Sequence, residues 1–266
     1  MKEAEMKLTS CLLTSLVVAG TLFAGILSVA PTSSLAQGKP GKDQSGTINE
    51  PTKIWSIGRG GQLYDNWWAV LDADEPKATH PAYPATAKRN GPTTWRCKEC
   101  HGWDYKGVKG AYAKGSHRTG IKGLRNMVGA DKAGIVATLR NKTHGYTEKM
   151  ITPSAMNKLA LFLASGQIDM DKYIDRATKK ARGNQRRGAQ LYQSICANCH
   201  GLDGKMLNFG SEKKPEYVGT VGKGNPWEAL HKIRFGQPAA NMAALSVLPI
   251  QEQVDLLAYI QGLPTK

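Results

Sequence analysis

The chain has 266 residues and a formal net charge of +15 at pH 7. This length allows one or two domains with buried cores once a leader is removed. A strongly basic chain often binds nucleic acid, but the N-terminal segment has the pattern of an export signal, which excludes that partner. The positive charge instead favours a partner with an acidic docking surface, or an anionic membrane face. The alternative is that the lysines serve only solubility.

The N-terminal segment, residues 1–36, has the pattern of a signal peptide. Two lysines precede the apolar run from Leu12 to Ala30, and Ser34-Leu35-Ala36 supplies the small residues of a cleavage site. We expect cleavage there and a periplasmic protein. The alternative is an uncleaved membrane anchor, because the run approaches the ~20 apolar residues of a membrane helix. Residues 37–53 are rich in Gly, Lys, Pro and Ser and are predicted to be a flexible tether.

Two five-residue segments, Cys97–His101 (pentad 1) and Cys196–His200 (pentad 2), carry the clearest chemical signal. Each has the pattern C-x-x-C-H, the attachment signature of a c-type haem. Two thiols on one turn of helix can each form a thioether to a haem vinyl group, and the adjacent imidazole then lies over the iron. A redox dithiol or half of a zinc site is the alternative, but a redox motif does not require the trailing histidine twice.

The pentads therefore predict two covalently attached haem c groups. Their thioether ligands are Cys97, Cys100, Cys196 and Cys199, and their iron ligands are His101 and His200. The fifth cysteine, Cys11, lies in the leader, so no pair remains for a structural disulfide.

The two halves of the chain repeat one another. Gly60-Gly61-Gln62-Leu63-Tyr64 in the first half matches Gly188-Ala189-Gln190-Leu191-Tyr192 in the second. Pentad 2 begins four residues after Tyr192, whereas pentad 1 begins 33 residues after Tyr64, which leaves an insertion of 29 residues at about 65–96. Its four prolines indicate that it is mostly loop.

Helices are predicted after each pentad and at the end of each half. Asp131 and Asn225 are the N-caps of the two middle helices. The closing helices begin at Pro153 and Pro249 and end at Gly166 and Gly262. Glycine-rich turns at 107–123 and 201–224 let the backbone wrap closely around a flat cofactor. The charged segment 167–187 is predicted to be the linker between the halves.

The ligand on the second face of each iron decides what the haem does, because methionine raises its potential, histidine lowers it and an open face binds other ligands. In the second half we predict Met242, which lies in an irregular loop between two helices, close to Gly236 and Pro238. His231 is the rival, but it precedes that loop on a helix and is expected at the surface or against a haem propionate.

The first half offers several candidates for this position. We predict Met150, because it precedes Pro153 much as Met242 precedes Pro249. Met156 falls on the apolar stripe of the closing helix, where core packing explains it, and Met127 comes early in the half. His117 and His144 remain open alternatives.

With these residues, the chain resembles the class I cytochrome c family over nearly all of its mature length. The resemblance implies an all-α fold of two tandem cytochrome c-type haem domains with loop-rich haem-wrapping segments, at residues 54–166 and 188–266. It also implies single-electron transfer. The chain is partly similar to dihaem thiosulfate dehydrogenases as well, but those enzymes use a cysteine axial ligand, and every mature cysteine here belongs to a pentad.

We therefore expect an exported dihaem c-type cytochrome that transfers single electrons between respiratory redox partners and does not bind nucleic acid. The alternative is a dihaem redox enzyme or enzyme subunit, for example in the oxidation of inorganic sulfur compounds, with haem 1 catalytic. The insertion would then form its pocket from Trp67, Trp68, His80, Tyr83 and Trp95. The simpler explanation is that these rings cover the haem or a contact between domains. A gas-sensing or structural haem module has no attached signalling segment to support it.

Overall fold

A computed structural model describes residues 52–266, which are helical and contain no β-strand apart from two isolated bridges, Gly107–Lys122 and Ile174–Ala181. The all-α expectation is confirmed for this part of the chain. The predicted signal peptide and most of the predicted tether lie outside the described residues. No helix within residues 52–266 has both the length and the apolar character needed to cross a membrane.

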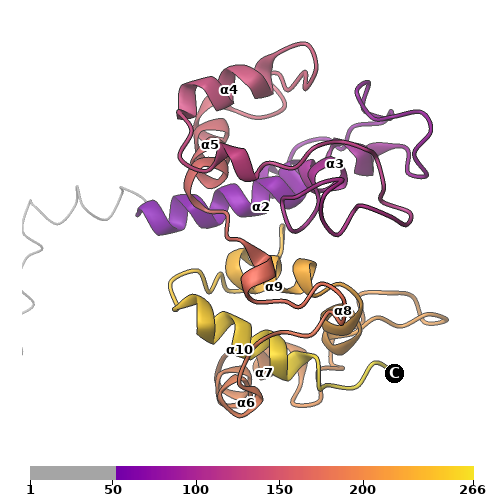
Figure 1. Ribbon diagram of the computed structural model, residues 1–266, viewed down its shortest axis with the longest axis vertical. Coiled ribbons are helices and arrows are strands. Elements are labelled where there is room, and N and C mark those ends of the chain that lie inside the picture. The colour runs from indigo at the N-terminus through magenta and orange to yellow at the C-terminus, as the bar shows by residue number, and fades with distance from the viewer. Residues whose placement is uncertain (1–51) are drawn as a thin grey trace, which may run out of the picture. The chain divides into compact units, whose positions relative to one another are not determined.

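The helices fall into two sequential groups (Figure 1). The first group, drawn from indigo to magenta, consists of α2 (Lys53–Leu71), η1 (Pro92–Trp95), α3 (Cys97–His101), η2 (Arg125–Met127), α4 (Lys132–Arg140) and α5 (Pro153–Ser165). After the short turn η3 (Met170–Lys172), the second group consists of α6 (Gln185–Leu191), the π-helical turn η4 (Tyr192–Cys196), α7 (Ala197–His200), α8 (Val218–Gly224), α9 (Pro226–Phe235) and α10 (Ile250–Ile260).

The predicted helix starts are confirmed. The Asp131 carboxylate accepts a hydrogen bond from the Gly134 amide at 2.9 Å, and the Asn225 side chain accepts one from the Glu228 amide at 3.4 Å. The closing helices α5 and α10 begin at and immediately after their predicted prolines. Local capping chemistry therefore sets these boundaries.

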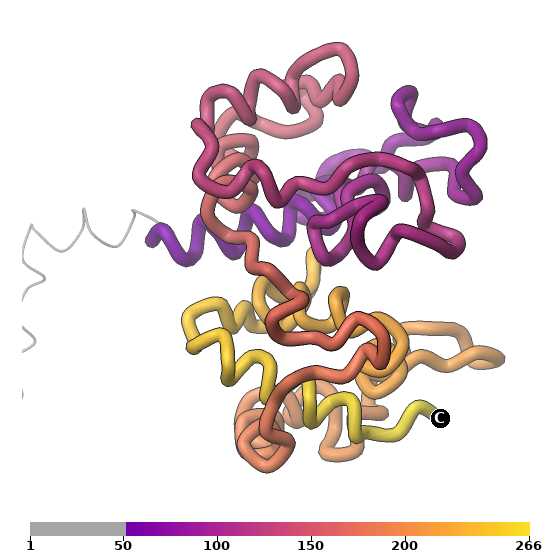
Figure 2. The backbone as a smooth tube through the Cα atoms, viewed as in Figure 1, coloured from indigo at the N-terminus to yellow at the C-terminus, as the bar shows by residue number. Residues whose placement is uncertain are grey.

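The segment predicted as an insertion is mostly loop, as expected, and only its two ends are helical. Helix α2 is interrupted at Asn66 (φ −153°, ψ 93°) and then continues to Leu71. These last residues are helical, and Trp67 and Trp68 bury their indoles in the core. Between α2 and η1 the chain makes a long excursion without helix, which Figure 2 shows in purple.

Two glycines of the sequence repeat allow close contacts between helices. A Cβ atom added to Gly60 on α2 would lie 2.1 Å from the Lys158 carbonyl oxygen on α5. A Cβ atom added to Gly188 on α6 would lie 2.0 Å from the Asp255 carbonyl oxygen on α10. Each half thus packs its first helix against its closing helix at a crossing that only glycine permits.

The segment predicted as the linker, residues 167–187, makes charged contacts with both halves. Arg176 contacts Asp104 of the first half at 2.9 Å, and its guanidinium lies 5.5 Å from the ring centre of Trp227 in the second half. Met170 and Ile174 are fully buried. The segment predicted as a charged linker therefore packs against both halves.

His231 lies at the contact between the halves, and the expectation of a surface position is wrong. Its ring is fully buried, with Nε2 2.9 Å from the Gly61 carbonyl and Nδ1 2.8 Å from the Tyr105 hydroxyl. Because a carbonyl only accepts, Nε2 carries the proton and Nδ1 accepts from the tyrosine. Burial lowers the pKa of His231 to about 3, so the ring is neutral.

Asp65 on α2 joins the halves through a buried ion pair. Its carboxylate is fully buried and contacts Lys232 on α9 at 2.7 Å, and it also pairs with Arg96. Burial by itself would raise the pKa of Asp65, but the charges of Lys232 and Arg96 outweigh it and lower the pKa below its usual 3.8. The ionised carboxylate is therefore part of the folded structure.

Replacing Asp65 with Asn should destabilise the protein in a pH-dependent way. A carboxyl group whose pKa is lowered by folding stabilises the protein above its unfolded pKa of about 4 and loses this effect as the pH falls through the folded value. We expect the unfolding free energy of Asp65→Asn to lie about 3 kcal/mol below wild type at pH 7. Urea titrations at several pH values should show this gap closing below about pH 4; a gap that stays constant would contradict the account.

Candidate functional site

A buried tyrosine holds each pentad by the same hydrogen bond. The Tyr64 hydroxyl donates to the Gly102 carbonyl at 2.6 Å, and the Tyr192 hydroxyl donates to the Gly201 carbonyl at 2.9 Å. These glycines follow the pentad histidines directly. They have nearly identical backbone angles, φ 79° with ψ 155° and φ 79° with ψ 157°. The positive φ explains why glycine stands at both positions.

The turn after each pentad also repeats. The His101 carbonyl accepts from the Gly107 amide at 2.8 Å, and the His200 carbonyl accepts from the Met206 amide at 3.0 Å. Within each turn an aspartate side chain accepts from the amide two residues later: Asp104 at 3.2 Å and Asp203 at 3.0 Å. The sequence repeat is therefore a repeat of main-chain geometry around the two pentads.

The pentad thiols do not have the character of a redox dithiol. All four cysteines in residues 52–266 are free. Burial raises the pKa of Cys97 to about 11, of Cys100 to about 12 and of Cys196 to about 11. Reactive C-x-x-C thiols have lowered pKa values. In the described part of the chain, no three His, Cys, Asp or Glu side chains lie together as metal ligands.

In pentad 1 the histidine is oriented by the backbone. His101 Nδ1 lies 2.7 Å from the Lys122 carbonyl. The carbonyl can only accept, so Nδ1 carries the proton and Nε2 keeps its lone pair. Burial lowers the pKa of His101 to about 4. A neutral imidazole with a free Nε2 is the form that ligates a metal.

The surroundings of pentad 2 fit a flat apolar cofactor. His200 Nδ1 is buried and makes no hydrogen bond to any described residue. Large apolar side chains next to the pentad are between 37% and 70% exposed: Ile195, Leu202, Met206, Leu207 and Phe209. The Phe209 ring centre lies 5.9 Å from that of His200. A covalently bound haem would cover such an apolar set and remove it from water.

Met242 lies in a loop that is fastened to α9. The Leu245 and Ser246 amides donate to the Ile233 and Arg234 carbonyls at 3.0 and 2.9 Å. Gly236 has φ +79°, and a Cβ atom there would lie 2.5 Å from the Met242 carbonyl oxygen. The half-buried Met242 is thus held in a defined loop, and its role as iron ligand stays a prediction.

The candidates for the second iron ligand in the first half differ in their contacts. Met156 is fully buried in the hydrophobic core. Met127 and Met150 are half-buried and pack against that core. His117 uses both ring nitrogens, with Nδ1 3.0 Å from Glu99 and Nε2 3.1 Å from Arg89. The remaining candidate, His144, faces His101, and the two ring centres lie 6.4 Å apart.

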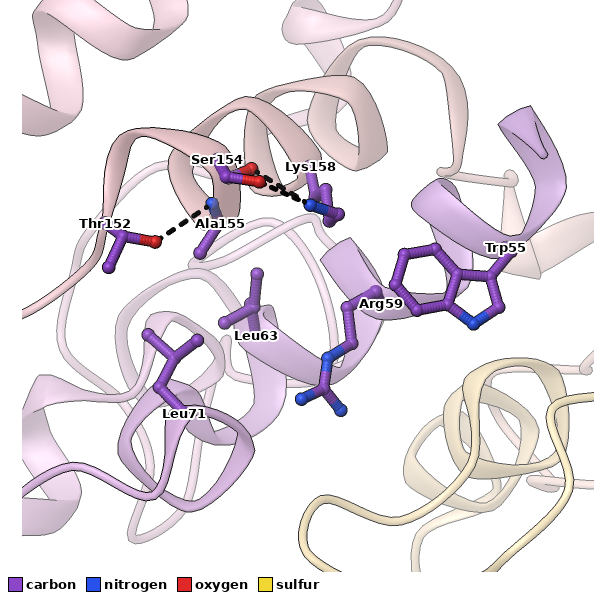
Figure 3. A pocket seen from close by; sticks show the side chains of 8 residues that line it. All are labelled: Trp55, Arg59, Leu63, Leu71, Thr152, Ser154, Ala155 and Lys158. Atoms are coloured by element: carbon purple, nitrogen blue, oxygen red, sulfur yellow. Dashed lines mark hydrogen bonds between the residues drawn. The ribbon is translucent and has the colours of Figure 1, made fainter. Parts of the chain in front are cut away.

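A pocket separate from both pentads lies between the beginnings of α2 and α5 (Figure 3). It is lined by Trp55, Arg59, Leu63, Leu71, Thr152, Ser154, Ala155 and Lys158. Arg59 is engaged by the Gln62 side chain at 2.9 Å and the Val70 carbonyl at 2.6 Å. None of the predicted haem-binding residues lines this pocket.

A comparison with known protein families finds a match in the second half of the chain. The family described as cytochrome c oxidase, cbb3-type, subunit III matches residues 183–260. These residues form a cytochrome c domain. The domain contains α6 to α10 and pentad 2, and it implies a covalently bound haem c and a role in haem-based electron transfer. No curated protein matches the chain.

The repeated tyrosine bonds predict parallel effects in the two halves. Tyr64→Phe and Tyr192→Phe should each lower the unfolding free energy by about 0.5–1.5 kcal/mol, because each removes one buried hydrogen bond. Thermal unfolding followed by circular dichroism measures the change. Tyr83→Phe is the matched control, since Tyr83 is also buried and its hydroxyl makes no hydrogen bond within residues 52–266. Equal stability of all three variants would contradict a stabilising role of the two tyrosine hydrogen bonds.

Proposed function

We propose that the chain is an exported dihaem c-type cytochrome that transfers single electrons between respiratory redox partners. Its haem domains are residues 54–166 and 188–266, joined by the linker at 167–187, and residues 1–36 direct export. The main support for the proposal is that the two halves repeat the same backbone arrangement around their pentads. The cytochrome c domain and the first half share the pentad, the tyrosine bond and the turn behind it. Attachment of haem c outside the cytoplasm agrees with the leader pattern.

Each half offers a fitting set of haem-binding residues. Cys97 and Cys100, and likewise Cys196 and Cys199, lie on a helix or helical turn that ends at the pentad histidine. When bound, a haem supplies a one-electron ferrous/ferric couple. The four pentad cysteines would hold the groups, His101 and His200 would each ligate an iron, and the surrounding chain would exclude water.

The charge of the chain supports docking to an acidic partner. The net charge of +15 at pH 7 is positive enough to remain so when haem propionates are added. Opposite charge on a partner would raise the rate of encounter without a large interface. We therefore propose a redox protein with an acidic docking surface as the partner.

The aromatic side chains of the first half favour the electron carrier over the enzyme. The Trp67 indole donates to the Trp95 carbonyl at 3.2 Å, and the Tyr146 hydroxyl donates to the same carbonyl at 2.8 Å. Trp67 and Tyr146 are buried, and their ring centres lie 6.1 Å apart. These rings fill a core next to pentad 1, as expected for a haem cover rather than a substrate pocket.

Haem counting tests the proposal directly. We expect two haems per chain in the mature protein by the pyridine haemochrome assay, made in a host that attaches haem to exported proteins. The double variants Cys97→Ser/Cys100→Ser and Cys196→Ser/Cys199→Ser should each retain one. One haem in the wild type, lost only with the second pair, would show that pentad 1 does not bind haem.

Salt should slow the reaction with an acidic redox partner. Stopped-flow reduction by such a protein should lose about tenfold in association rate between low and high ionic strength, because salt screens steering charges. Reduction by a small uncharged reductant is the control and should change little. An association rate indifferent to salt would exclude electrostatic docking.

A further inference from the structure

We propose that haem 1 is ligated by two histidines, His101 and His144, rather than by His101 and Met150. The inference rests on the proposed function, because it requires that pentad 1 binds haem. Its basis is the arrangement of the two imidazoles, which come from separate segments and face one another beside the pentad. His101 ends α3, and His144 lies in the turn that follows α4.

The distance between the two rings fits a shared metal. An imidazole nitrogen lies about 2.0–2.1 Å from a transition metal, and the ring centre lies about 1.1 Å behind that nitrogen. Two imidazoles on opposite sides of one metal ion therefore have ring centres about 6.3 Å apart. The centres of His101 and His144 are 6.4 Å apart, with 27° between the ring planes.

Both rings also present the same free nitrogen. His101 Nδ1 donates to the Lys122 carbonyl at 2.7 Å, and His144 Nδ1 donates to the Thr138 carbonyl at 3.0 Å. In each ring Nδ1 therefore carries the proton and Nε2 keeps its lone pair. Neither Nε2 makes a hydrogen bond within residues 52–266. A backbone carbonyl on the far nitrogen is the usual support of a histidine that ligates a metal.

The loop that carries His144 is fixed by its own contacts. The His144 amide donates to the Asn141 side chain at 3.1 Å, and the Gly145 amide donates to the Asn141 carbonyl at 2.8 Å. Arg140 spans the loop, donating to the Tyr146 carbonyl at 2.8 Å and to the Ile151 carbonyl at 2.6 Å. The side chain is therefore placed before any cofactor is bound, as a preorganised ligand requires.

The insertion supplies a positioning residue for this loop. The Ala82 amide donates to His80 Nδ1 at 3.1 Å, so His80 Nε2 carries the proton and donates to the His144 carbonyl at 3.0 Å. His80 is 6% exposed, and its ring centre lies 4.3 Å from that of Trp95. The insertion thus holds the backbone of His144 in place, a contact that the second half, without an insertion, does not need.

The second half has no histidine at the matching place. Gly145 and Gly236 both have positive φ, 64° and 79°, and they correspond in the sequence repeat. The residue before Gly236 is Phe235, which is fully buried against α2 at Gly61. The two halves can therefore have the same backbone arrangement and still differ in the second ligand of the iron.

Near-infrared magnetic circular dichroism of the ferric holoprotein tests the proposal. We expect two charge-transfer bands of similar intensity, one of the bis-histidine type and one of the histidine–methionine type. In His144→Ala the bis-histidine band should vanish, haem 1 should bind carbon monoxide when reduced, and added imidazole should restore the band. His117→Ala is the matched control and should keep the wild-type spectrum.

Further variants separate the possible failures. His144→Met should convert the bis-histidine band into a second methionine band and raise the lower reduction potential. Loss of a methionine band in Met150→Leu, with an unchanged spectrum in His144→Ala, would overturn the proposal while two haems per chain still support the proposed function. A wild-type protein with a single haem would instead overturn the proposed function itself.

Discussion

Each pentad is held in place by a hydrogen bond from a buried tyrosine hydroxyl to the carbonyl of the glycine that follows it. One such bond contributes only about 1 kcal/mol, but leaving the buried hydroxyl unpaired costs more. The bond joins the first helix of each half to its pentad, and Gly60 or Gly188 joins the same helix to the closing helix. Three segments thereby present two cysteines and a histidine in the same way twice, and the second set lies within the residues that match a cytochrome c family.

The halves differ through the insertion, and the proposed ligand of haem 1 gives this difference a functional consequence. His80 and the rings around Trp95 hold the loop of His144 in front of His101. A bis-histidine haem has a lower potential than one with a methionine ligand. With the proposed ligand sets, electrons would pass downhill from haem 1 to haem 2. The buried contact between the halves has a neutral His231 at its centre, which bonds to Gly61 and Tyr105.

Much of this could be predicted from the sequence, because local chemistry determines it. Asp131, Asn225 and the two prolines set helix starts through capping, and the C-x-x-C-H spacing is fixed by the cofactor. What could not be predicted depends on contacts between distant residues. The burial of His231 requires Gly61 and Tyr105, and the pairing of His101 with His144 requires two loops to meet. Counting along the repeat favours Met150, whereas the ring arrangement that supports the proposal of His144 becomes visible only in the structure.

A potentiometric titration of the mature protein, followed by ligand-sensitive spectroscopy, tests the central claim most directly. The account predicts two separate one-electron steps of equal amplitude, with the bis-histidine signal changing at the lower potential and the methionine signal at the higher one. Two haems that titrate together, both with a methionine signal, would contradict the difference between the halves. A single one-electron step would contradict the proposal that each half binds a haem.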